Sequence, residues 1–77
     1  MSKKIVFTRH ALERIKSRGL TAEWVIDIIK NPTSALAIEP DNTQEFRQER
    51  SGSYYYAVVE HKASVIVVIT NGECGKP

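Results

Sequence analysis

A histidine and two arginines recur at every fourth position near the start of the chain, at His10, Arg14 and Arg18. Residues four apart lie on one side of a helix, so the spacing predicts a basic stripe. The stripe begins in the first turn, where a helix carries partial positive charge and its free N–H groups can bind an anion. A sheltered histidine beside two guanidinium groups should be neutral and able to transfer a proton next to a phosphate. In the alternative interpretation, His10 packs against a sheet and the arginines pair with strand carboxylates.

Further candidates lie in stretches that should form strands. Glu60 closes an apolar stretch, where its carboxylate could serve in catalysis or pair with Arg14 or Arg18. Arg47 stands between two glutamates, so it is either a phosphate ligand or part of a solvated cross-strand network. Three consecutive tyrosines, residues 54–56, cannot all point one way along a strand, and one of them could stack a base.

Charge is unevenly spread along the 77 residues, although the net charge is only +2. Residues 1–20 hold six Lys or Arg against one Glu, a net +5, and residues 21–49 hold two against six acidic residues, a net −4. A basic quarter in a nearly neutral molecule favours a local anion site over a broad nucleic-acid coat. The length predicts one domain with a small core.

Several classes of protein are disfavoured by composition. His10, His61 and Cys74 have no metal-ligand spacing, and no glycine-rich phosphate loop is present, so no metal or other cofactor is expected. No apolar run reaches about 18 residues, so no membrane partner is expected. A single cysteine and the lack of an apolar signal core predict a reducing, cytoplasmic location. That cysteine falls in residues 71–77, which we expect to form a flexible tail.

Two helices are predicted in the first half of the chain. Thr8 is a suitable N-cap for a helix over residues 9–18, which should end at Gly19. Ala11, Leu12 and Ile15 should form its buried face. A second helix over residues 21–31 should end before Pro32.

After Pro32 the apolar period changes to that of strands, which we expect at residues 34–39, 44–50, 54–60 and 64–70. Helices segregated from strands indicate an α+β fold, with two helices packed on one face of an antiparallel sheet of about four strands. The apolar residues 3–7 could add a short N-terminal strand.

Residues 7–25, a second helix ended by proline, and strands that end VVE and VIVVIT resemble a small bacterial family of domains of unknown function. Its opening pattern is His-Ala-x-x-Arg-x-x-x-Arg-Gly, and it is grouped with the RelE/ParE-type toxins. The resemblance covers about residues 5–70. It implies one RelE-like domain over residues 1–77 and, more weakly, metal-independent endoribonuclease cleavage of RNA.

The resemblance places the family pattern on His10, Arg14 and Arg18, with Glu60 matching an acidic strand end. His10 and Glu60 would then be catalytic, and Arg14, Arg18 and Arg47 would bind phosphate. The later strands offer fewer basic and aromatic residues than RelE-type nucleases have, and no terminal helix follows Thr70. Two alternatives therefore stay open: a non-catalytic module that binds an antitoxin-like protein, and an inactive relative in which the His/Arg motif is structural.

Overall fold

The computed structural model describes residues 3–75. The first helix has the predicted bounds and caps, and the second is one residue shorter at each end than predicted. Helix α1 spans Arg9–Arg18, and the Thr8 side chain accepts a hydrogen bond from the Ala11 amide. It ends at Gly19, whose φ of 69° lies in the left-handed region that glycine enters without strain. Helix α2 spans Ala22–Lys30, with Thr21 as its N-cap. The local capping chemistry is therefore enough to set these boundaries.

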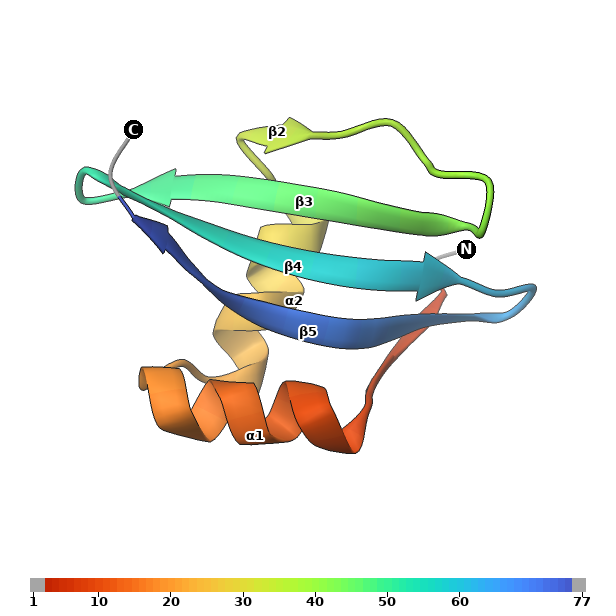
Figure 1. Cartoon of the computed structure of the whole chain (residues 1–77), viewed down its shortest axis with the longest axis horizontal. Helices are drawn as coiled ribbons and strands as arrows, with labels where there is room; N and C mark the ends of the chain where they lie inside the picture. Colours follow the sequence, from red (N-terminus) through yellow and green to blue (C-terminus); the bar gives the residue numbers. More distant parts are fainter. Residues whose placement is uncertain (1–2, 76–77) are drawn as a thin grey trace.

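The strands form one five-stranded mixed sheet in the order β1-β5-β4-β3-β2 (Figure 1). Their bounds are β1 Lys4–Phe7, β2 Ser34–Ala35, β3 Thr43–Arg50, β4 Ser53–His61 and β5 Val65–Gly75. Strands β2 to β5 form the expected antiparallel meander. Strand β1 pairs with β5 in parallel, so the prediction of an antiparallel sheet is wrong at this edge. The α+β class and the two helices are confirmed.

Two strand boundaries differ from the predictions for residues 34–39 and 64–70. Only Ser34–Ala35 of the first stretch is a strand, because the chain beyond it stays along β3 through isolated hydrogen bonds of Leu36 and Glu39 and not through a regular ladder. Strand β5 continues past Thr70 to Gly75, so residues 71–75 are not the expected tail. Both Asn71 and Gly72 are buried. Residues 76–77 lie outside the described part of the chain.

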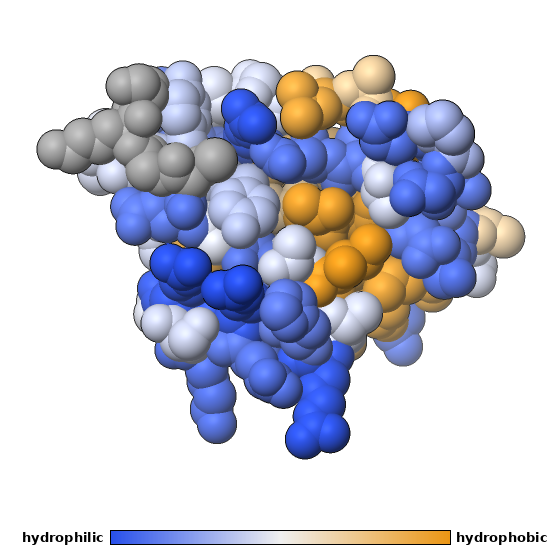
Figure 2. Space-filling view, in the orientation of Figure 1, coloured by the Kyte–Doolittle hydropathy of each residue, from blue (hydrophilic) through white to orange (hydrophobic). Residues whose placement is uncertain are grey.

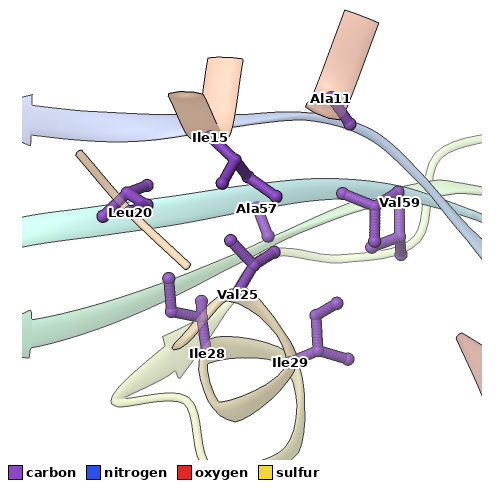
Figure 3. Close-up of a cluster of buried hydrophobic side chains, with 9 residues drawn as sticks. Ala11, Ile15, Leu20, Val25, Ile28, Ile29, Ala57 and Val59 are labelled. Atoms are coloured by element: carbon purple, nitrogen blue, oxygen red, sulfur yellow. The ribbon is translucent and has the colours of Figure 1, made fainter. Parts of the chain in front are cut away.

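The core lies between the helices and one face of the sheet (Figure 3). It is made of nine buried apolar side chains: Ala11, Ile15, Leu20, Val25, Ile28, Ile29, Ala57, Val59 and Val68. Both helices turn their apolar faces toward Ala57 and Val59 of β4. Leu12, which we expected in the buried face of α1, is half exposed because Ala11 and Ile15 alone face the sheet. The opposite face of the sheet carries no helix, and we call it the helix-free face (Figure 1).

A polar cluster attaches α2 to the end of β3. Gln48 is buried and accepts a hydrogen bond from Trp24 Nε1 at 3.3 Å. Its own Nε2 donates to Asp27 Oδ2 at 2.9 Å, and Arg50 pairs with the same carboxylate at 3.2 Å. The Arg50 guanidinium also lies 4.8 Å from the centre of the Trp24 ring. Since these partners satisfy the buried amide, the cluster stabilises the packing of helix on sheet.

Acid should weaken this attachment. Hydrogen bonds from Gln48 and then Asn31, with the charge of Arg50, hold the pKa of Asp27 below its ordinary value of 3.8. Because the folded-state pKa is lower than the unfolded one, the stabilisation is present above about pH 4 and is lost as the pH falls through the folded value. We expect Asp27→Asn to reduce the acid sensitivity of urea unfolding, whereas Glu23→Gln on the same helix should retain it. Equal pH dependence in Asp27→Asn and the wild type would contradict this role.

Candidate functional site

Helix α1 is fixed along strand β5 by three hydrogen bonds. Just before the helix, the Thr8 amide donates to the Val68 carbonyl at 3.0 Å, and the Thr8 hydroxyl donates to the Ile69 carbonyl at 3.1 Å. One turn later, Asn71 Nδ2 donates to the Ala11 carbonyl at 3.2 Å. The helix therefore lies alongside β5 and runs in the same direction (Figure 1).

The handedness of α1 decides where its basic stripe lies. Ala11 and Ile15 turn toward the core. His10 and Arg14 each precede one of them by a single position, about 100° around a right-handed helix. Given the direction of α1 along β5, this rotation turns them toward the helix-free face, while Leu12 and Lys16 take the other flank. We call the side that carries His10, Arg14 and Arg18 the basic flank.

The basic flank is open to solvent. His10 and Arg18 are exposed and Arg14 is half-buried, so the expected shelter around the histidine is not found. Within residues 3–75, none of these three side chains makes a hydrogen bond or an ion pair. Arg9, by contrast, lies 3.6 Å from Glu13 on the outer side of the helix. The alternative in which the arginines pair with strand carboxylates is therefore not seen in the described part of the chain.

A row of residues crosses the helix-free face toward this flank. In the sheet register, Arg47 of β3 is opposite Tyr56 of β4, and Tyr56 is opposite Gly72 of β5. A Cβ atom at Gly72 would lie 3.1 Å from the Tyr56 hydroxyl oxygen and 3.3 Å from two of its ring carbons. The tyrosine ring therefore covers the glycine closely, and a side chain at this position would force the ring to shift by a few tenths of an ångström. Asn71, the residue before Gly72, donates a hydrogen bond to the Ala11 carbonyl of α1. The row therefore ends beside the basic flank.

The remaining two predicted site residues have partners on the sheet. Arg47 Nε lies 2.6 Å from Glu45 Oε2, two positions away on the same strand, and this pair does not cross between strands as the network that we considered would. Glu60 lies 3.6 Å from Lys62 Nζ and is not paired with Arg14 or Arg18. It is four positions from Tyr56 on the same strand, roughly 13 Å at about 3.3 Å per residue. The structure thus places Arg47 in the row with Tyr56 and sets Glu60 apart from it.

Hydrophilic side chains gather over α1, and apolar side chains cover the middle of β4 and β5 on the helix-free face (Figure 2). This juxtaposition offers cations for phosphate beside an apolar and aromatic surface for bases. Binding at such a surface would not need a deep cleft, because single-stranded nucleic acid can bind along an open sheet.

Asn71 and Gly72 are parts of this site that the sequence analysis missed. Both fall within residues 71–77, which we expected to form a flexible tail. The available signal was the unbroken apolar strand before them, which does not need to end at Thr70. Asn71 is fully buried, and its Oδ1 has no hydrogen-bond partner among the described residues. Its amide links the helix that carries the basic flank to the strand that supports Tyr56.

These features define a small α+β domain with two helices on one face of a mixed sheet and a basic helix beside the open face. Residues 7–74 match the family model described as a domain of unknown function (DUF4258), and the chain belongs to that family. No curated protein and no solved structure matches the chain. In the described part of the chain, neither helix is long and apolar enough to cross a membrane.

Proposed function

We propose that this domain is a toxin-like protein of the RelE/ParE type that acts on RNA as a metal-independent endoribonuclease. The observation that supports it is that the basic flank of α1 turns toward the helix-free face, which carries the Arg47–Tyr56 row. Arg14 and Arg18 have no protein partner in the described residues, so their charges are available to phosphate. A half-buried tyrosine on an open sheet is a platform on which a base can stack.

The chemistry assigned to the site is transfer within the RNA backbone. The ribose 2′-oxygen attacks the neighbouring phosphorus, its proton passes to a base, and the 5′-oxygen leaves with a proton from an acid. The products are a 2′,3′-cyclic phosphate and a 5′-hydroxyl. His10 is exposed at the start of α1, where it can reach a bound phosphate and transfer one of these protons. Arg14 stabilises the extra negative charge on the phosphate. Glu60 is left out because of its ion pair with Lys62.

Incubation with mixed RNA in excess chelator tests this proposal, with fragments ending in 2′,3′-cyclic phosphate as the readout. His10→Ala should slow cleavage by about 100-fold or more, the usual contribution of a general acid or base. Arg14→Ala should weaken RNA binding and slow cleavage, because it removes a phosphate contact. Lys16→Ala removes an equal charge from the other flank of the same helix and should leave cleavage nearly unchanged.

Two results would count against the proposal. Equal losses in Arg14→Ala and Lys16→Ala would show that only the overall charge of the helix matters. Undetectable cleavage by a folded wild type, with no RNA binding in a fluorescence anisotropy titration, would reject action on RNA. Binding without cleavage would reject the proposed nuclease activity but would support the proposal that this surface binds RNA.

A further inference from the structure

The segment Ser34–Glu39 covers the outer edge of strand β3. On its inner side, the Leu36 amide donates to the Glu45 carbonyl at 3.0 Å, and the Glu39 amide donates to the Thr43 carbonyl at 2.8 Å. The Gln44 side chain donates to the Leu36 carbonyl at 2.9 Å. The segment is thus held against the sheet at both ends and in its middle, at the edge farthest from α1.

The other side of this segment is unoccupied by the described chain. The backbone amides of Ala37 and Ile38 have no hydrogen-bond partner within residues 3–75. Leu36 is 47% exposed and Ile38 is 56% exposed, and these are two of the three most exposed large apolar residues described. Apolar side chains are visible along the rim over the segment that follows β2 (Figure 2). Free amides beside exposed apolar side chains form an edge to which another strand can pair.

A pocket of about 150 Å³ opens next to this edge. Leu36, Ala37 and Val58 supply its apolar walls, and Glu39 and Glu45 supply carboxylates. A volume of this size accepts one aliphatic side chain from a neighbouring strand.

The charge of this edge is negative. Residues 34–46 contain Glu39, Asp41 and Glu45 and no lysine or arginine. Arg47, opposite Ser34, pairs with Glu45, so Glu39 and Asp41 carry the remaining negative charge of the edge. Hydrogen bonds from the hydroxyl and the amide of Thr43 lower the pKa of Asp41 below its ordinary value of 3.8. RNA is repelled by such an edge, and so is the same edge of a second copy. The complementary occupant carries positive charge.

We propose that the segment Ser34–Glu39 is a docking edge for another protein, which adds an extended strand in which apolar residues alternate with lysine or arginine. The strand pairs with the outer side of the segment around the free amides of Ala37 and Ile38 and places one apolar side chain against the Leu36 and Ala37 wall of the pocket. Its basic side chains face Glu39 and Asp41. This inference does not depend on action toward RNA, because the edge lies across the sheet from the basic flank.

The probe is a fluorescein-labelled peptide, Lys-Val-Lys-Leu-Lys-Val-Lys, titrated into the intact chain and followed by anisotropy and by amide NMR shifts. We expect saturable binding at or below about 1 mM, the affinity of a weak peptide site, with shifts centred on Ala37 and Ile38. A peptide with Glu in place of each Lys tests the charge. A peptide N-methylated at alternate residues tests the strand pairing, since it cannot donate the main-chain hydrogen bonds. Both should bind about tenfold more weakly or worse.

Two variants test the same edge on the protein. Ala37→Pro removes a free amide without breaking a described hydrogen bond, and Glu39→Lys reverses one charge; each should weaken binding by about three- to tenfold. Glu49→Lys, an exposed carboxylate outside the segment, should change it by less than about twofold. Equal binding of the acidic or N-methylated peptide would overturn the proposal. So would shifts confined to α1, or self-association of the free chain through residues 36–38.

Discussion

Replacing Asn71 by aspartate should destabilise the domain by about 3–5 kcal/mol at pH 7, the usual effect of an uncompensated buried charge. Asn71 is fully buried, and its only described side-chain bond is donated to the Ala11 carbonyl. An ionised aspartate has no proton to donate and would place its charge against that carbonyl oxygen. The substitution changes the volume very little, so the effect reports on charge and hydrogen bonding.

The pH dependence of this variant should have the opposite sign to that of the wild type. Burial raises the folded-state pKa of such an aspartate above its unfolded value, so the variant gains stability as the pH falls from about 7 toward 4. The wild type contains Asp27 and Asp41 with lowered pKa values and should lose stability in acid. Urea unfolding at both pH values measures the difference. Thr70→Asp, on the half-buried neighbouring position, is the matched control and should show a much smaller effect at pH 7. A variant whose stability is independent of pH would contradict the buried, unpaired environment.

Ile28→Ala should produce the second large effect, a loss of about 2–5 kcal/mol in the free energy of unfolding. Ile28 is the largest fully buried side chain described, and it packs from α2 against the sheet beneath β4. Domains of this size have a total stability of only roughly 4–12 kcal/mol, so a measurable fraction should be unfolded at 37 °C.

The control for Ile28→Ala uses the same chemical change at an exposed place. Ile38→Ala should shift the free energy of unfolding by less than about 0.5 kcal/mol, because Ile38 is 56% exposed. Urea unfolding, analysed with one m value for both variants, measures the two changes in the free energy of unfolding. If the two substitutions had equal effects, the assignment of Ile28 to the centre of the core would be wrong.

The helices were predictable because their signals are local. Thr8, Gly19 and Thr21 satisfy or terminate backbone hydrogen bonds within one turn, and the structure places the caps there. The meander of β2 to β5 was predictable for the same reason, since each strand pairs with its neighbour in sequence. The parallel pairing of β1 with β5 was not, because residues 4–7 alone carry no information on which distant strand they meet.

The site was predictable in composition and less so in arrangement. The spacing of His10, Arg14 and Arg18 correctly implies one side of a helix, but a helical wheel does not say which face of a sheet that side adjoins. The direction of α1 along β5 decides this, and it depends on Thr8 and Asn71 bonding across about 60 residues of sequence. The same long-range contact explains why the role of Asn71 and Gly72 could not be predicted from their neighbours in sequence.

The bond between Ala11 and Asn71 also has a consequence for synthesis on the ribosome. These residues are 60 positions apart, and β1 likewise finds its partner only in β5. Contacts this distant in sequence form late, because the intervening chain has to be ordered first. As the chain emerges, α1 can form early but has no strand to pack against until β5 has left the exit tunnel. The basic flank therefore acquires its position beside Tyr56 only after β5 has been synthesised, and chains that stop before β5 lack it.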